Sequence, residues 1–74
     1  METLDLRVIK EKRNKLKMSM QEMAETLEMK NASTYMKYEN GTYAFKAQHL
    51  PILADALDCK ISDFFSQKVA VLAT

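Results

Sequence analysis

Few side chains in this sequence could carry out catalysis, and their spacing does not group them. The chain has one histidine, His49, and one cysteine, Cys59, and no third residue stands beside either to complete an acid-base or nucleophilic set. Glu22, Glu25 and Glu28 recur every three residues, which could suggest a metal-binding face, but three carboxylates on an exposed helix usually serve solvation. We therefore expect no enzymatic activity, no metal and no cofactor. His49 is expected to be a surface or capping residue and Cys59 a small apolar residue of a turn.

Arg13 is the charged residue whose position needs an explanation. Leu6, Ile9 and Leu16 recur at steps of three and four, the spacing of one helical face, and Arg13 falls among them. A guanidinium buried on an apolar stripe is costly unless a partner satisfies it. Two interpretations remain open: Arg13 forms a buried ion pair, or it carries its head group out to solvent along its apolar stem.

Length and composition restrict the fold to one small helical domain. A chain of 74 residues has room for a single core. Hydrophobic residues make up 47% of it, and one glycine and one proline are too few for a disordered or turn-rich all-β chain. A lone cysteine cannot form an internal disulfide, and no apolar stretch matches a signal peptide or a membrane span. We expect an all-α, soluble, cytoplasmic protein.

The net charge of +1 conceals an uneven distribution along the chain. Residues 1–17 carry a net +3, residues 18–29 a net −3, residues 30–46 a net +2 and residues 47–74 a net −1. The total is far below the excess expected of a protein that coats nucleic acid without specificity. Two basic blocks flanking an acidic helix could still leave one face positive, although a mixed, solvated surface is the default interpretation.

Helix-start and helix-stop signals divide the chain into five short helices. Ser19 with Glu22 three residues later forms a capping-box pattern, and Asn31 is a favoured N-cap. Asn40-Gly41 is a typical helix end. The helices are predicted at residues 4–16, 20–27, 32–40 and 48–57, followed by a short fifth helix that Ser62 and Asp63 begin and that presents Phe64 and Phe65.

The segment from about Leu6 to Phe65 resembles the lambda-repressor and Cro-like helix-turn-helix family, also called the XRE family. The resemblance depends on Arg13 eleven residues before Ala24 and on four stretches in a fixed order: QEMAETL at 21–27, YENG at 38–41, LPILADAL at 50–57 and ISDFF at 61–65. Each feature is weak alone, but their order and distances are specific for the family. The resemblance implies a compact five-helix lambda-repressor-like DNA-binding domain with its helix-turn-helix at about residues 20–40.

The same resemblance implies roles for individual residues. It places helix 32–40 in the major groove of double-stranded DNA and pairs Arg13 with Glu39, which would tie the first helix to the end of the third. The implied base contacts are Ala32, Ser33, Thr34, Met36 and Lys37. The expected phosphate contacts, including free main-chain amides at 19–21, are Lys17, Ser19, Met20, Gln21, Lys30, Asn40, Tyr43 and Lys46. Tyr35 and Tyr38 are expected to face the core.

Three features depart from the family pattern. Met20 stands where members often place a glutamine, the turn before helix 32–40 looks one residue longer than the common form, and the loop after Gly41 has Lys46 as its only cation. None of the expected base contacts is an Arg, Asn or Gln able to bind one base through two hydrogen bonds. We therefore expect moderate specificity, raised by a homodimer that binds a palindromic operator.

The two ends of the chain are assigned differently. Residues 1–67 form the DNA-binding domain and residues 68–74 a short apolar tail, which either extends the fifth helix or forms a strand. The candidate dimer residues are Phe65, Val69, Val71 and Leu72. The alternative is that these residues close the core of the monomer.

The sequence thus predicts a sequence-specific DNA-binding transcriptional regulator, a repressor of phage, mobile-element or bacterial type with no small-molecule ligand. The alternative is a helical protein-interaction module, of the antitoxin or antirepressor kind, that uses the same fold without DNA. Met20 and Met36 favour this alternative because clustered methionines make an adaptable apolar surface. Met23 and Met29 are expected inside the core.

Overall fold

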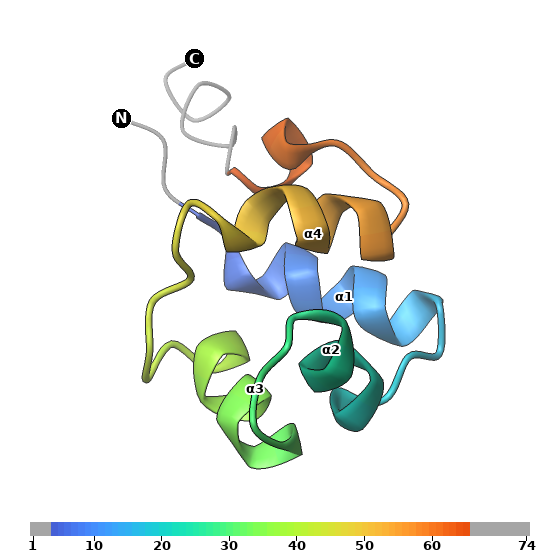
Figure 1. Ribbon diagram of the computed structural model, residues 1–74. Coiled ribbons are helices and arrows are strands. Elements are labelled where there is room, and N and C mark those ends of the chain that lie inside the picture. The colour runs from blue at the N-terminus through green and yellow to red at the C-terminus, as the bar shows by residue number, and fades with distance from the viewer. Residues whose placement is uncertain (1–3, 66–74) are drawn as a thin grey trace.

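A computed structural model describes residues 4–65, which form four α-helices and one 3₁₀ turn (Figure 1). The elements are α1 (Leu6–Lys15), α2 (Met20–Thr26), α3 (Ala32–Glu39), α4 (His49–Ala56) and the 3₁₀ turn η1 (Ile61–Phe64). The α2 and α3 helices pack against each other, α1 contacts α3, α2 contacts α4, and η1 contacts α1 and α4. The predicted all-α class is confirmed over the described residues.

The start of α1 is set by a contact with the other end of the described chain. Leu4 forms an isolated antiparallel bridge with Phe65. Leu4 is therefore outside the helix, and Asp5 becomes the N-cap, with its carboxylate accepting a hydrogen bond from the Arg7 amide at 3.0 Å. The predicted helix start at Leu4 was two residues too early for this reason.

The predicted fifth helix is wrong. Ile61–Phe64 makes only a single 3₁₀ turn. Phe65, which follows the turn, has an extended backbone and forms the bridge with Leu4. Ser62 does not cap the turn, because Lys60 is the N-cap and its amide donates to the Asp63 carboxylate at 3.1 Å. The conformation of residues 68–74 lies outside the described residues.

The predicted caps of α2 and α3 are confirmed. Ser19 Oγ accepts a hydrogen bond from the Glu22 amide at 3.0 Å, and Glu22 Oε1 accepts one from the Ser19 amide at 2.8 Å. Asn31 Oδ1 accepts from the Thr34 amide at 2.9 Å. Because these contacts close within three residues, α3 begins at Ala32 as expected, and the longer turn before it does not displace it.

Three helices end in the same motif, and each places a residue other than glycine in the left-handed conformation. Lys17, Glu28 and Asp58 have φ of 59°, 57° and 54°. The amide that follows each of them bonds back to the final turn of its helix: Met18 to the Arg13 carbonyl, Met29 to Ala24 and Cys59 to Ala54. This is the Schellman arrangement, in which the residue after the left-handed position packs on the core. Cys59 is thus the apolar turn residue expected, and burial raises the pKa of its thiol.

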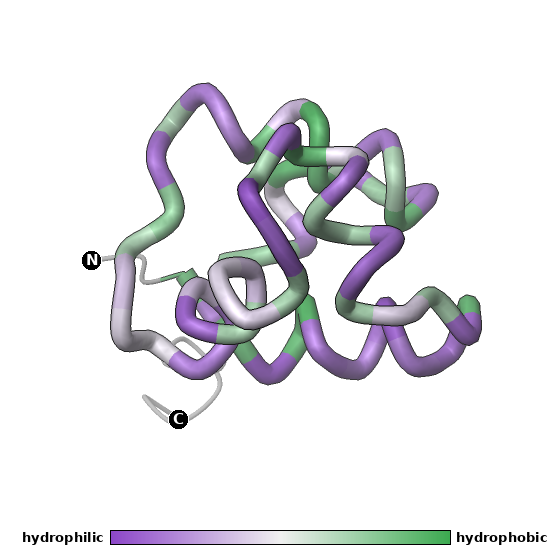
Figure 2. The backbone as a smooth tube through the Cα atoms, turned by 60° about the horizontal axis from the view of Figure 1, so that its bottom comes forward, coloured by the Kyte–Doolittle hydropathy of each residue, from purple (hydrophilic) through white to green (hydrophobic). Residues whose placement is uncertain are grey.

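The core is built from one face of every helix. Figure 2 shows hydrophobic and hydrophilic residues alternating along the chain, as amphipathic helices require. The buried core residues are Ile9, Met23, Ala24, Leu27, Tyr35, Leu53, Ala54, Leu57 and Phe64. Met23 is fully buried and Met29 is half-buried against this core, as predicted.

A buried ion pair joins α1 to the end of α3. Arg13 Nε donates to Glu39 Oε2 at 2.8 Å and Arg13 Nη2 donates to Glu39 Oε1 at 3.1 Å, so the pairing is bidentate. The remaining terminal nitrogen, Nη1, donates to the Met18 carbonyl at 3.0 Å, and the Tyr35 hydroxyl donates to Glu39 Oε2 at 2.8 Å. With Arg13 only 8% and Glu39 only 7% exposed, the alternative of a solvent-directed Arg13 is excluded.

The same contacts shift the ionisation of the groups they join. The hydrogen bond to Glu39 raises the pKa of Arg13, against the opposing effect of its burial. Burial, followed by the hydrogen bond to Glu39, raises the pKa of Tyr35. Both shifts favour the states seen in the contacts, a neutral Tyr35 that donates and a charged Arg13.

We predict strong energetic coupling between Arg13 and Glu39. Arg13→Met or Glu39→Gln alone leaves a buried group without its partner and is expected to cost about 3–5 kcal/mol, while the double variant costs less than the sum. Urea unfolding at low temperature measures the three values. Arg7→Met is the matched control, since the Arg7 side chain is 72% exposed beside Asp5 and its loss is expected to leave stability almost unchanged. Strictly additive costs for Arg13 and Glu39 would contradict the pairing.

We also predict that Glu28→Gly stabilises the domain. Glycine adopts a positive φ without steric cost, and the gain, reduced by the entropy of glycine in the unfolded chain, is expected to be about 0.5–1 kcal/mol. The denaturation midpoint reports the gain. Glu25→Gly, at a helical position in α2, is the matched control and is expected to lose about 1 kcal/mol. An unchanged or lower midpoint for Glu28→Gly is the outcome that this account does not allow.

Candidate nucleic-acid interface

The outermost ridge of α3 is formed by residues at helical spacing from one another. Tyr35 and Glu39 are buried and mark the inner side of α3. Ser33, Lys37 and Asn40, three or four residues apart, are exposed and lie on the opposite side. The α2–turn–α3 unit therefore presents one hydroxyl, one ammonium group and one amide along a single line.

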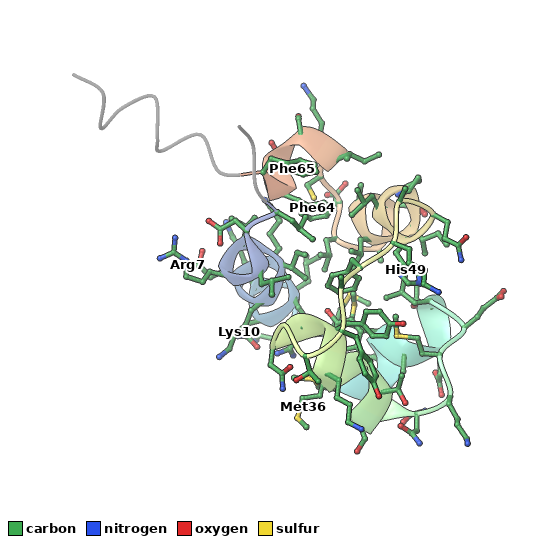
Figure 3. The ribbon with its side chains drawn as sticks, turned by 90° about the vertical axis from the view of Figure 1, so that its left-hand side faces the viewer. Arg7, Lys10, Met36, His49, Phe64 and Phe65 are labelled. Carbon is green, nitrogen blue, oxygen red and sulfur yellow. The ribbon has the colours of Figure 1, made fainter. Side chains whose placement is uncertain are left out.

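The other expected base contacts lie on the flanks of this ridge. Ala32 and Thr34 are half-buried, and Thr34 Oγ1 donates to Asn31 Oδ1 at 3.0 Å, so the hydroxyl proton is already used in the cap. Met36 is 44% exposed and points outward from α3 (Figure 3). All five expected base-contact residues therefore lie at the surface of one helix. Of their two hydroxyl groups, the one on Ser33 is not used in the cap.

The start of α2 has fewer donors than the sequence suggested. The Ser19 amide was expected to be free, but it donates to Glu22 Oε1 and is therefore engaged, which corrects that expectation. The Gln21 side chain donates to Glu25 Oε2 at 3.1 Å. The amides of Met20 and Gln21 remain first-turn donors without an acceptor inside the helix. At this end of α2, acidic side chains thus already accept hydrogen bonds from the Ser19 amide and the Gln21 side chain.

The expected phosphate-binding lysines are all accessible. Lys17, Lys30 and Lys46 are exposed, and within residues 4–65 the two ion pairs involve arginines only. Asn40 Oδ1 accepts from the amide and the hydroxyl of Thr42, at 2.9 and 2.7 Å. The NH₂ group of Asn40 is therefore the part of its side chain that remains available for an outside contact. The remaining expected contact, Tyr43, has 45% of its surface exposed.

An aromatic cluster shapes the loop between α3 and α4. The Tyr38 ring centroid lies 5.4 Å from Tyr43, 5.3 Å from Phe45 and 5.3 Å from His49. His49 Nδ1 accepts from the Lys46 amide at 3.0 Å, which makes His49 the cap of the turn that leads into α4. His49 thus caps this turn, although no side chain caps α4 itself, and it is buried and not on the surface.

Lys10 is a candidate contact that the sequence reasoning missed. It lines a hollow of about 280 Å³ with Met20, Met36, Glu39 and Asn40, next to the end of α3. Figure 3 shows Lys10 and Met36 on the same side of the molecule. The signal was available, because Lys10 lies one helical turn before Arg13, and the pairing of Arg13 with Glu39 brings that part of α1 to α3.

Several expected roles are not brought into this site. Phe65 is half-buried in its bridge to Leu4, and Val69, Val71 and Leu72 lie outside the described residues. Within residues 4–65, no three metal-ligating side chains lie together in a way that could hold an ion. No helix in that range has the length and apolar character needed to cross a membrane.

We predict that His49 makes folding pH-dependent. Burial, and then the nearby Lys46 charge, lower the pKa of folded His49 below its ordinary 6.5, so the unfolded chain binds the proton first as the pH falls. Stability is therefore fully present above about 6.5 and is lost from there down to the folded pKa, by at most about 1.4 kcal/mol per pH unit. His49→Asn keeps an acceptor for the Lys46 amide and cannot titrate. Urea midpoints from pH 7.5 to 5.5 are expected to fall less in this variant, and identical slopes would refute the assignment.

Comparison with known proteins agrees with this geometry. A family model described as helix-turn-helix matches residues 9–64, from within α1 to the end of η1. The matched range contains the α2–turn–α3 unit and both members of the Arg13–Glu39 pair. No curated protein and no solved structure matched the chain. The chain belongs to the XRE family of helix-turn-helix domains, the Cro-like domains that bind DNA.

Proposed function

We propose that this protein is a sequence-specific transcriptional regulator that inserts α3 into the major groove of double-stranded DNA. The observation that carries the proposal is the presentation of α3. Its inner side is anchored by Glu39, while Ser33, Lys37 and Asn40 project along one exposed ridge. A rigidly held helix with a polar outer ridge is what base recognition in the groove requires.

The distribution of charge supports a backbone contact on both sides of α3. Lys17 and Lys30 lie at the two ends of the α2 segment, and Lys46 lies in the loop after α3. Phosphate contacts from such lysines, together with Asn40 and Tyr43, fix the position of the protein without reading sequence. Ala32, Ser33, Thr34, Met36 and Lys37 are left as the set from which base contacts are drawn.

We further propose a homodimeric repressor that acts in the cytoplasm on a palindromic operator. The ridge of α3 carries no Arg, Asn or Gln in its first turn, so one subunit has few ways to distinguish bases. Two subunits on half-sites one helical turn apart double the number of contacts. Phe65 lies at the end of the molecule away from α3 (Figure 3), so it can belong to the dimer surface without obstructing DNA.

The rival function, a protein-interaction module without DNA binding, retains one observation in its favour. Met20 and Met36 line the same hollow beside Lys10. Met20 is half-buried and packs on the core, however, so Met36 is the one methionine of this pair with a large exposed surface. A single exposed thioether beside a polar ridge makes only a small apolar patch. DNA binding, in contrast, also accounts for the polar residues of the ridge.

Ser33→Asp tests the proposal directly. A carboxylate in the first turn of α3 favours the helix, because it faces the positive end of the helix dipole, so stability is expected to be unchanged or slightly higher. Binding to a duplex selected from a random library by the wild type is expected to weaken at least about tenfold, since the new charge meets the phosphates of the groove. Titration at several salt concentrations measures both affinity and its salt dependence.

Ser62→Asp is the matched control, because Ser62 is exposed on η1, far from α3. It is expected to bind like the wild type. Equal binding by Ser33→Asp would remove α3 from the interface. A wild type that selects no duplex, and whose retention on DNA does not depend on salt, would favour the protein-interaction function.

A further inference from the structure

Lys37 does not extend freely from α3. Its Nζ lies over the ring of Tyr43, 5.6 Å from the centroid, within the range of a cation–π interaction. The main chain joins the same two residues, because the Tyr43 amide donates to the Lys37 carbonyl at 3.0 Å. Two contacts of different kinds therefore bind Lys37 to the loop that follows α3.

Tyr43 is a suitable platform because its own position is fixed. Its ring meets Tyr38 edge-on, with centroids 5.4 Å apart and planes at 69°. The residue before it, Thr42, is held by Asn40, whose Oδ1 accepts from both the amide and the hydroxyl of Thr42. Tyr43 nevertheless remains 45% exposed, so its ring supports a cation at the surface and not inside the core.

The direction of this contact decides which part of DNA Lys37 reaches. In helix-turn-helix complexes the first turn of the recognition helix meets the base edges. The Tyr43 ring instead lies against Lys37 and Tyr38, in the last turn of α3, and belongs to the loop that also carries Lys46. We infer that Tyr43 is a positioning residue that draws the Lys37 ammonium away from the base edges and directs it to a backbone phosphate.

This inference rests on the proposed function and refines it, because it changes which residues read sequence. With Lys37 on the backbone and the Thr34 hydroxyl proton donated to Asn31, the base-facing set reduces to Ala32, Ser33 and Met36. Two of these three side chains are apolar. Lys37 and Tyr43 then act as one unit that adds affinity without adding discrimination.

The test compares two duplexes of equal length, one selected from a random library by the wild type and one with the same bases scrambled. Lys37→Met is expected to weaken binding to both by the same factor and to reduce the slope of log K against log salt by about 1. Lys60→Met, which removes a lysine at the start of η1, is the matched control and is expected to leave both affinities unchanged. Loss on the selected duplex alone would overturn the inference and make Lys37 a base reader.

Tyr43 is tested through its dependence on Lys37. Tyr43→Leu is expected to weaken both duplexes about two- to fivefold in the wild-type background and to have a smaller effect in Lys37→Met, where only the phosphate contact of Tyr43 itself is left to lose. Tyr43→Phe keeps the ring and is expected to restore the coupling with Lys37. An equal effect of Tyr43→Leu with and without Lys37, or a Tyr43→Phe variant that couples no better than Tyr43→Leu, would overturn the positioning role.

A measurement on the free protein separates this inference from the proposed function. The ring current of Tyr43 is expected to shift the ε-methylene protons of Lys37 upfield, and the shift is expected to vanish in Tyr43→Leu and persist in Tyr43→Phe. An unshifted signal in the wild type would overturn the inference alone. A wild type that binds no duplex overturns the proposed function, whereas a wild type that binds while Lys37→Met binds equally well overturns only the role of Lys37.

Discussion

The geometry of the DNA-facing unit depends on one buried charge pair. Arg13 and Glu39 are both less than a tenth exposed, and removing two such charges from water is expensive. The structure offsets that cost with four hydrogen bonds: two within the pair, one from Arg13 to the Met18 carbonyl, and one from Tyr35 to Glu39. Because these bonds reach α1, the turn before α2 and the last turn of α3, a single network sets the relative positions of three segments.

The features that were predictable from sequence are mostly those decided within a few residues. The capping box of Ser19 and Glu22 and the cap at Asn31 each close over three positions, so residue types alone located the starts of α2 and α3. The partner of Arg13 is a different case, since 26 residues separate it from Glu39. Periodicity showed only that Arg13 needed a partner, and the family resemblance supplied which one.

The features that sequence did not reveal are decided by contacts between distant residues or by chemistry without a distinct signature. The prediction of a fifth helix was wrong because Phe65 pairs with Leu4, which lies at the other end of the described sequence. Lys17, Glu28 and Asp58 occupy left-handed positions at which glycine is usual, so no glycine in the sequence indicated these helix ends. The contact of Lys37 with Tyr43 requires the loop after α3 to fold back, which residue spacing alone does not specify.

The capping of α2 has an electrostatic consequence for how the domain holds DNA. Glu22 satisfies the Ser19 amide and also places a carboxylate at the helix end that would otherwise attract phosphate. Together with Glu25 and Glu28, it makes this segment acidic, so that α2 supports α3 but is poorly suited to bind the DNA backbone. In the proposed complex, attraction comes from separate lysines at the margins, because with a net charge of +1 the long-range field adds little. Such a domain gains affinity by multiplying local contacts, and this is the physical reason for proposing a second subunit.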